Sequence, residues 1–288
     1  MLEDSFGIGF VSAGFITSES HAPSVGYLPD THVAAILNPT ESRATDLAET
    51  CRAEGWGDPS VYGAGEVAAM AADSDVDGLW VTSPNHTRAE VIETAAEAVA
   101  DGAALAGIAV EKPVARDLAE ADRIVDAIER VDLPHAYLEN WPHEPDIAKM
   151  RRLLWERGRS SGRPYIARSQ AEHGGPHSAW FWDGRKQGGG ALTDMLCHAL
   201  AGNDFLLSDP EADDDIEPIA VSADAETLKW GRPSYAEQLR EEHGVDYEAN
   251  PADDYARATV RYAGPDEETL ISEATGSWCF VGPGVRRQ

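Results

Sequence analysis

The sequence predicts an α/β protein in which a doubly wound parallel sheet precedes an α+β domain with a largely antiparallel, open sheet. Over residues 6–138, short apolar runs alternate with segments of helical length, as parallel strands require because crossover helices must connect them. After residue 139 this alternation stops, and long polar segments separate the apolar runs. We therefore expect two domains, residues 1–138 and residues 139–288.

The first domain begins with an apolar run over residues 6–13, followed by Gly14, which predicts a strand, a tight turn and the start of a helix. The same reasoning applied along the chain predicts further strands over 32–37, 76–83, 103–110 and 133–138, and helices over 41–54, 87–100 and 118–130. Strands and helices in this order form a parallel sheet covered on both faces.

The second domain has a less regular order of elements. Apolar periodicity predicts helices over 146–157 and 190–207, and strands over 165–171, 217–228, 255–262 and 269–277. A glycine-rich loop between the first strand and the second helix carries His173, His177, Trp180 and Trp182. Indoles stack on the apolar faces of sugar rings, so this loop could line a substrate pocket, but the two tryptophans could equally be core anchors.

The charge balance excludes nucleic acid as a partner. The chain has 51 acidic and 23 basic residues, a formal net charge of -28, and such a surface repels phosphates. Only four of the basic residues are lysines, at positions 112, 149, 186 and 229. An acidic, lysine-poor surface is typical of a protein that stays soluble in high salt, where self-repulsion is screened, so we expect a halophilic source.

Other compositional features exclude a membrane protein and a disulfide framework. No stretch approaches the roughly 20 apolar residues that span a bilayer, and the N-terminus does not resemble a signal peptide, so we expect a cytoplasmic protein. The three cysteines form no CxxC, which argues against structural zinc. Between His173 and His177, glycines and a proline break the helix that a ligand pair would need, so no metal site is expected.

Two clusters suggest a catalytic site. Glu111-Lys112-Pro113 ends an apolar run, and a triple glycine at 188–190 precedes Asp194 and His198. An Asp and a His four residues apart lie on one helix face, so the carboxylate can orient the imidazole or share a substrate hydroxyl with it. Many Asp–His pairs with this spacing are ordinary surface pairs. The sequence features before these two clusters decide whether they form a catalytic site.

The first strand and turn resemble a dinucleotide-binding site. Where a fingerprint would read Gly-x-Gly-x-x-Gly, the chain reads Ser12-Ala13-Gly14-Phe15-Ile16-Thr17 and keeps the middle glycine, which lets backbone approach a pyrophosphate. A tight turn of any doubly wound protein could look the same. At the end of the second strand, Asn38 replaces the acidic residue that favours NAD, and with Thr40, Ser42 and Arg43 nearby this favours NADP. Alternatively, Asn38 only starts a turn.

In this order and spacing, Gly14, Thr82-Ser83-Pro84-Asn85-His86, Glu111-Lys112-Pro113 and the glycine-rich Asp194-x3-His198 segment resemble the Gfo/Idh/MocA oxidoreductases. This is the glucose-fructose oxidoreductase and inositol dehydrogenase family, and the resemblance spans residues 6 to about 280. It implies an NAD(P)-binding Rossmann domain and a dehydrogenase or reductase that transfers a hydride between the nicotinamide and a CH–OH or carbonyl group of a sugar, polyol, inositol or related molecule.

The resemblance also implies roles for single residues. The catalytic set is Lys112, Asp194 and His198: Lys112 would contact nicotinamide and substrate from a carboxyl strand end, and Asp194 and His198 would flank the reacting carbon across the cleft, with His198 accepting the proton. The cofactor-binding set is Ser12, Gly14, Phe15, Ile16, Asn38, Thr40, Arg43, Thr82, Ser83, Pro84, Asn85, His86, Glu111 and Lys112. The substrate-binding set is Lys112, Asn140, His173, His177, Trp180, Asp194 and His198.

The chain departs from the family pattern at Ser12 and Thr17, which replace glycines, and at Asn38. It also ends at Gln288, where family members continue through further strands, so either this copy is truncated or the last strands of the sheet are missing here, and an incomplete sheet would leave an exposed edge. A homodimer or homotetramer formed through the C-terminal sheet is expected. Two alternatives remain: an idle member that binds dinucleotide or sugar as a sensor, and a methyltransferase of similar architecture, in which the two catalytic clusters would have no role.

Overall fold

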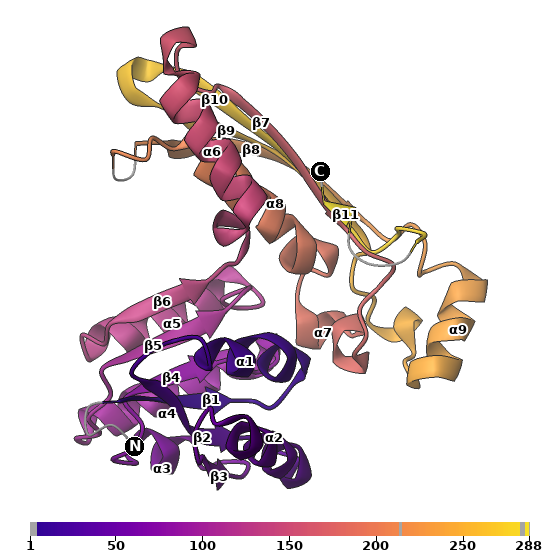
Figure 1. Cartoon of the computed structure of the whole chain (residues 1–288). Helices are drawn as coiled ribbons and strands as arrows, with labels where there is room; N and C mark the ends of the chain where they lie inside the picture. Colours follow the sequence, from indigo (N-terminus) through magenta and orange to yellow (C-terminus); the bar gives the residue numbers. More distant parts are fainter. Residues whose placement is uncertain (1–4, 213–214, 283–285, 288) are drawn as a thin grey trace. The chain divides into compact units, whose positions relative to one another are not determined.

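The computed structural model describes residues 5–212, 215–282 and 286–287. The chain forms two compact units, Met1–Leu138 and Glu139–Gln288, which are coloured from indigo to magenta and from magenta to yellow in Figure 1. Among the described residues, no helix is both long enough and apolar enough to cross a bilayer.

The N-terminal unit contains a six-stranded parallel sheet in the order β3-β2-β1-β4-β5-β6. Its strands are β1 (Phe6–Val11), β2 (Thr31–Leu37), β3 (Ser60–Tyr62), β4 (Gly78–Val81), β5 (Gly107–Glu111) and β6 (His135–Leu138). The strand order reverses between β1 and β4, and in such sheets ligands bind at the carboxyl ends of the strands beside this reversal. The predicted doubly wound parallel sheet is confirmed, with β3 as an additional edge strand.

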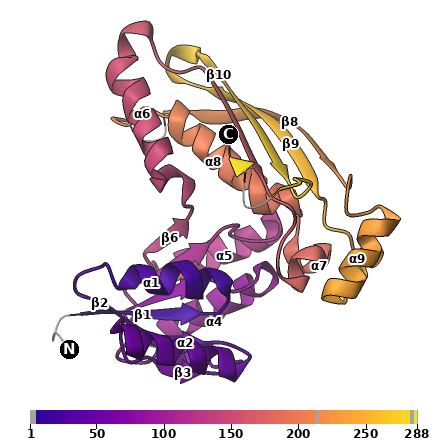
Figure 2. The same cartoon turned by 45° about the vertical axis from the view of Figure 1, so that its right-hand side comes forward.

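Helices cover both faces of this sheet (Figures 1 and 2). Ile8 and Phe10 of β1 pack with residues of α1 (Ala22–Val25) and α2 (Glu41–Glu54), whereas Val11 packs on the opposite face. That face is covered by α3 (Val67–Ala71), α4 (Arg88–Ala100) and α5 (Leu118–Arg130). Short helical turns, η1 (Thr17–His21) and η2 (Asn85–Thr87), precede α1 and α4. Alternation of side chains across the pleat thus divides the core into two layers.

The C-terminal unit contains a five-stranded mixed sheet in the order β11-β7-β10-β9-β8. The strands are β7 (Ile166–Glu172), β8 (Glu217–Glu226), β9 (Tyr255–Ala263), β10 (Thr269–Ser277) and β11 (Arg286–Arg287). Among the described residues of this sheet, only β7 and β10 pair in parallel, so the predicted, largely antiparallel sheet is confirmed. β8 forms one edge, and every residue in it is exposed.

One face of this sheet is covered by α8 (Cys197–Leu207), and α6 (Pro145–Arg157) packs against α8, as both views show. The part of this unit that the structure describes also contains the helices α7 (Gly184–Gln187) and α9 (Pro233–His243). Short turns are η3 (Trp141–His143), η4 (Arg159–Ser161), η5 (Ala179–Trp182), η6 (Leu192–Leu196), η7 (Tyr247–Ala249) and η8 (Pro265–Glu267). The helix predicted over 190–207 is therefore divided into the π-helical η6 and α8.

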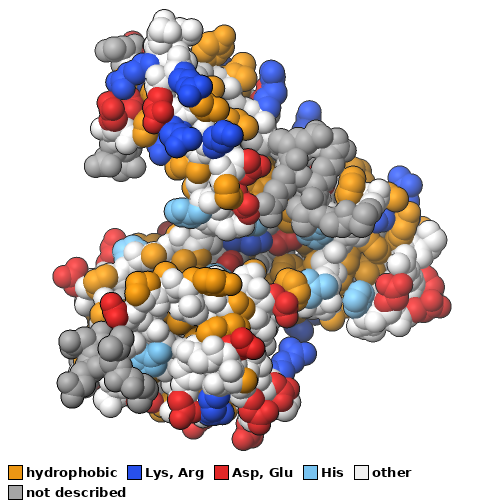
Figure 3. Space-filling model, viewed as in Figure 1, with side chains coloured by type: hydrophobic (Ala, Val, Ile, Leu, Met, Phe, Trp, Pro, Cys, Tyr) orange, Lys and Arg blue, Asp and Glu red, His pale blue; other side chains and the backbone are white. Residues whose placement is uncertain are grey.

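Helix α9 was not predicted from the sequence, because its residues belong to a long polar connection between two predicted strands. Proline at the first helical position starts this helix, but only Ala236 and Leu239 are buried, so little apolar periodicity marks it. On the face shown in Figure 3, acidic side chains are spread over both units, and Lys and Arg side chains gather over α6.

Candidate functional site

The turn after β1 adopts a backbone conformation that the residue type does not favour. Ser12 is buried and has a φ of 113°, in the region that glycine adopts at little cost. Its N–H donates to the Leu37 carbonyl at 2.8 Å, which ties the turn to the end of β2. Ser12 thus occupies the first glycine position of the fingerprint and keeps the glycine-like backbone.

We expect Ser12→Gly to raise the free energy of unfolding by about 1 kcal/mol. Relief of a strained non-glycine residue gives about 1–3 kcal/mol, and the extra freedom of glycine in the unfolded chain removes roughly 0.5–1 kcal/mol of that gain. Urea denaturation measures the difference. The matched control is Ala13→Gly, which relieves no positive φ and should destabilise the protein. An equal loss of stability in both variants would contradict the strain at Ser12.

Gly14 marks the point at which a ligand can approach the backbone. Its φ lies outside the positive range, and an added Cβ would meet only the Ser12 Oγ, at an ordinary contact distance of 3.4 Å. Neither the conformation nor the packing of the described chain requires glycine here, so close approach of a phosphate is the remaining physical reason. Phe15 and Ile16, which follow, are exposed. The turn therefore fits a dinucleotide.

Thr17 occupies the position of the third fingerprint glycine, and its side chain packs inside the protein. Thr17 is fully buried, and its Oγ1 lies 2.7 Å from the Thr82 Oγ1. The Thr82 hydroxyl also lies 3.2 Å from the Val11 carbonyl. These contacts join the start of η1 and the end of β1 to the residue that follows β4. Thr82 was predicted to bind the cofactor, and in the structure its hydroxyl contacts Thr17 and the Val11 carbonyl.

Arg88 is a buried residue that was not among the predicted site residues. Its guanidinium donates to the Ser83 carbonyl at 2.9 Å and the Glu111 carbonyl at 2.7 Å, and also to the Pro113 carbonyl. It therefore holds the ends of β4 and β5, including the backbone on both sides of Lys112. A positively charged side chain in the first turn of a helix interacts unfavourably with the helix dipole. This unfavourable position could have identified Arg88 from the sequence as a residue with a specific role.

The Glu111-Lys112-Pro113 segment lies at the carboxyl end of β5, as predicted. The Lys112–Pro113 peptide bond is cis, and Lys112 is half-buried. The buried Glu111 carboxylate contacts the His21 Nε2 at 3.0 Å. In the neighbouring loop after β4, Asn85 is buried, and Pro84 and His86 are half-buried.

Asn38 links two strand ends. Its Oδ1 accepts from the Ala13 N–H at 3.1 Å, and its Nδ2 donates to the Thr40 carbonyl at 2.9 Å. The side chain is buried, so it serves the turn, which was the alternative interpretation of this residue. Arg43 is exposed in the first turn of α2.

In the C-terminal unit, His198 forms a buried pair with Glu139. The His198 Nδ1 lies 2.6 Å from the Glu139 Oε1, and the same oxygen accepts from the Trp141 N–H at 3.0 Å. The Trp141 indole stacks on the imidazole, with centroids 5.8 Å apart and planes 11° apart. Gly202 allows this approach, because a Cβ there would lie 2.8 Å from the indole. The carboxylate thereby fixes the ring orientation and places the proton on Nδ1.

Two roles were predicted for Asp194, to orient the imidazole of His198 or to share a substrate hydroxyl with it, and this pair shows that Glu139 has the first role. The Asp194 Oδ2 instead accepts from the Trp278 Nε1 at 2.9 Å and contacts the His173 Nε2 at 3.2 Å. Both Asp194 and His198 are buried. The orienting carboxylate is Glu139, which lies far away in sequence, so no local spacing could indicate it.

The glycines before η6 are needed by the backbone. Gly190 has a φ of 60°, and an added Cβ would lie 2.0 Å from the Asp253 carbonyl oxygen, so no other residue fits. The side chain of the fully buried Gln187 holds the Gly190 N–H and carbonyl. This anchor sets where η6 begins and hence where Asp194 lies.

The remaining predicted substrate residues differ in placement. His177 is exposed, and partial desolvation lowers the pKa of its ring, while the Asp194 carboxylate opposes the shift and His173 adds to it. Trp180 is half-buried and stacks on Phe181, with centroids 3.8 Å apart. Asn140 is exposed and donates to the Glu144 Oε1 at 3.0 Å. His173 and His177 therefore share the surroundings of Asp194.

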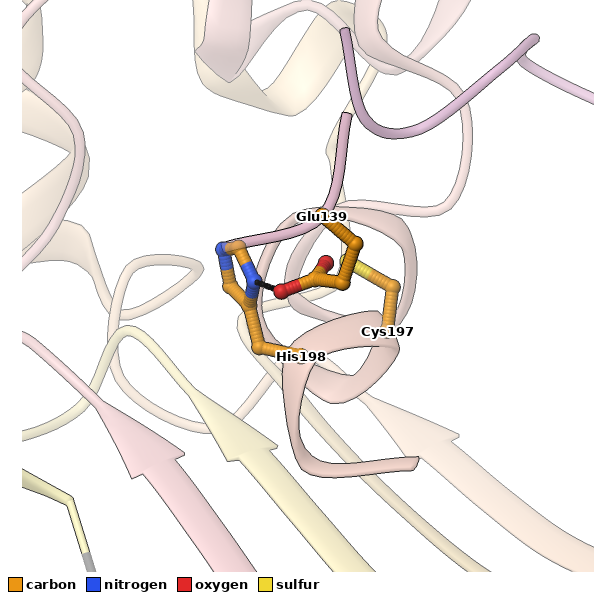
Figure 4. A group of neighbouring side chains, drawn as sticks. All are labelled: Glu139, Cys197 and His198. Atoms are coloured by element: carbon orange, nitrogen blue, oxygen red, sulfur yellow. Dashed lines mark hydrogen bonds and ion pairs between the residues drawn. The ribbon is translucent and has the colours of Figure 1, made fainter. Parts of the chain in front are cut away.

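Trp182 is a core residue, as one of the two interpretations held. It is almost fully buried and packs edge-on against Trp230, Trp278 and Tyr247. Among the described residues, one set could hold a metal ion: the predicted residue His198 with Glu139 and Cys197, which were not predicted, and their ligand atoms lie within 4.8 Å of one another (Figure 4).

Family models match most of the chain. A model described as "Oxidoreductase family, NAD-binding Rossmann fold" matches residues 6–135, and a GFO/IDH/MocA C-terminal domain model matches residues 147–283. Protein YMR315W of Saccharomyces cerevisiae, described as uncharacterized, is 25% identical over 67% of this chain and 53% of its own length. The levoglucosan dehydrogenase of Pseudarthrobacter phenanthrenivorans is 28% identical over 48% of this chain and 34% of its own length.

A solved structure shares the fold. GenD2 from gentamicin A biosynthesis, in complex with NAD, superimposes with a TM-score of 0.75 at 21% identity, covering 100% of this chain and 69% of GenD2. The family model that matches residues 6–135 describes an NAD-binding Rossmann fold, so the N-terminal unit is an NAD-binding Rossmann domain. Together, the two models cover both units, and the chain belongs to the GFO/IDH/MocA oxidoreductase family.

Proposed function

We propose that this protein is an NAD(P)-dependent oxidoreductase that transfers a hydride between the nicotinamide and a CH–OH or carbonyl carbon of a sugar, polyol, inositol or related molecule. The observation that carries the proposal is the buried pair of His198 and Glu139, a carboxylate-held imidazole of the kind that accepts a proton from a hydroxyl. The levoglucosan dehydrogenase similarity and the NAD-binding domain support the same chemistry.

In the proposed mechanism, each residue has a limited task. The nicotinamide, when bound, would supply the hydride acceptor. The turn at Ser12 and Gly14, the loop at 83–86 and Lys112 would hold the cofactor. With its Nδ1–H directed at Glu139, His198 would accept the substrate hydroxyl proton at Nε2, while Lys112 stabilises developing negative charge on the oxygen. Asp194, anchored by Trp278 and His173, would bind a second hydroxyl of the substrate.

The test is a screen of sugars, polyols and inositols with NAD and NADP, following reduced nicotinamide by absorbance. Lys112→Met should lose most of the activity of the wild type, and Lys149→Met, an exposed control on α6, should keep it. Full activity in Lys112→Met would refute the site. If no substrate reacts while NAD or NADP still binds, the sensor interpretation replaces this proposal.

For the cofactor, we propose a preference for NADP based on Arg43. Arg43→Ala should raise the KM for NADP about tenfold, because a charge-assisted contact to a phosphate contributes roughly 1.5–3 kcal/mol. The KM for NAD should not change. The control is Arg52→Ala in the last turn of α2, where the arginine pairs with Asp58. If Arg43→Ala changed the KM for NADP and the KM for NAD equally, the proposed preference for NADP would be contradicted.

We also propose that the protein works in high salt. Its net charge of -28 produces self-repulsion, which molar salt screens because the Debye length falls to about 3 Å at 1 M. The thermal midpoint, measured by circular dichroism, should therefore rise steadily from low to molar KCl. A midpoint that falls over this range would contradict adaptation to salt.

Finally, we propose that copies of the chain associate through the C-terminal sheet as a dimer or tetramer. The edge strand β8 exposes Ile219 and Val221, and an exposed apolar edge favours pairing. Light scattering after size exclusion should give a multiple of the 31.0 kDa chain mass, and Val221→Lys should lower it. A monomeric mass for the wild type would reject this assembly.

A further inference from the structure

The trio Glu139, Cys197 and His198 brings three different ligand types together. Glu139 follows β6, and Cys197 and His198 are the first two residues of α8. Their ligand atoms lie within 4.8 Å of one another, and Figure 4 shows the carboxylate between the imidazole and the sulfur. Glu139 and His198 are buried and Cys197 is half-buried, so these three side chains are less exposed to water than those of a surface cluster.

The donor set selects a particular class of cation. Thiolate and imidazole ligands favour Zn²⁺ and related soft divalent ions, whereas Mg²⁺ and Ca²⁺ prefer oxygen ligands alone. In a tetrahedral site with Zn–N and Zn–O near 2.0–2.2 Å, the two ligand atoms are separated by about 3.3 Å. The Glu139 and His198 atoms are 2.6 Å apart, so these two side chains need to separate by under about 1 Å to admit the ion, and the Cys197 sulfur lies within 4.8 Å of a ligand atom of each.

We propose that Glu139, Cys197 and His198 form a site for Zn²⁺ or a similar soft divalent cation, and that the bound ion prevents the imidazole from accepting a proton. The ion binds the Nδ1 of His198, the Glu139 carboxylate and the Cys197 thiolate, with water as a fourth ligand. The thiol proton goes to solvent, and the ring proton moves from Nδ1 to Nε2. Binding therefore strengthens as pH rises, because a proton is released.

This change of tautomer has a direct chemical consequence. In the metal-free protein the Nδ1–H faces Glu139, which leaves Nε2 as the acceptor. With the ion on Nδ1, the Nε2 carries the proton and can no longer accept one from a hydroxyl. The inhibition part of the inference rests on the proposed function, whereas the binding part does not.

Metal binding is tested on the whole, chelator-treated protein with CdCl₂ as the probe. Titration should produce the ultraviolet cadmium–thiolate charge-transfer band, saturating at one equivalent. Cys197→Ser should lose the band, and Cys51→Ser and Cys279→Ser, which change the other two thiols, should keep it. No band in the wild type, or a band that survives in Cys197→Ser, would overturn the site.

The other two ligands are tested by competition between the protein and a chromophoric chelator for Zn²⁺. Glu139→Gln and His198→Gln should each weaken Zn²⁺ binding by at least about tenfold, with thermal midpoints confirming that both variants are folded. Unchanged Zn²⁺ affinity in either folded variant would remove that residue from the site.

Inhibition is measured separately. If the protein has dehydrogenase activity, ZnCl₂ should inhibit the wild type, and inhibition should be reversed by chelator and weakened in Cys197→Ser relative to that variant's own metal-free rate. Absence of dehydrogenase activity together with a normal cadmium band would reject the proposed function alone. Activity insensitive to ZnCl₂, with no cadmium band, would reject only this inference.

Discussion

Changing His198 to Gln is expected to lower kcat by about 10²- to 10⁴-fold, the range that a positioned acid–base group contributes. Glutamine keeps a polar side chain of similar size but cannot accept and release the proton at neutral pH. Stopped-flow or steady-state measurement of nicotinamide reduction under saturating substrate gives kcat directly. Glu156→Gln, an exposed carboxylate on α6, is the control and should match the wild type.

Glu139 is a positioning residue, so its variants should behave differently from those of His198. Glu139→Gln keeps an acceptor for the His198 Nδ1–H and the Trp141 N–H but removes the negative charge beside the imidazole. The ring is then held less firmly, so kcat should fall while the KM for the substrate changes little. Glu139→Ala also removes the anchor and should lower kcat further. A kcat equal to that of the wild type in Glu139→Gln would reduce Glu139 to a structural residue.

Replacing Arg88 with Met is expected to lower the free energy of unfolding by about 3 kcal/mol, because each buried acceptor left unsatisfied costs about 1–3 kcal/mol. Three carbonyls, those of Ser83, Glu111 and Pro113, would lose their donor. The backbone around Lys112 would also lose its support, so the KM for the cofactor should rise. Urea denaturation and cofactor titration measure the two effects.

Two further variants separate geometry from charge at this position. Arg88→Lys keeps the charge but cannot reach all three carbonyls, so it should recover only part of the lost stability. Arg130→Met, exposed at the end of α5, should change stability by less than about 0.5 kcal/mol. If Arg88→Lys were as stable as the wild type, the forked geometry of the guanidinium would not matter.

Several features could be predicted from sequence because their physical causes are local. Alternation of apolar runs and amphipathic segments predicted the parallel sheet, since strand and helix periodicities depend on neighbouring residues. The Glu111-Lys112-Pro113 segment could be placed at a strand end for the same reason. Where periodicity was weak, as over α9 with its two buried residues, the prediction was wrong.

The sequence by itself therefore determined the fold class, the family resemblance and the choice of Lys112, Asp194 and His198 as candidates. Only the tertiary structure decided which groups touch them: Glu139, not Asp194, holds His198, and Arg88 holds the backbone beside Lys112. Glu139 and His198 are 59 residues apart, and Arg88 and Glu111 are 23 apart. Such contacts depend on how strands and helices pack in space, and residue spacing along the chain does not encode that packing.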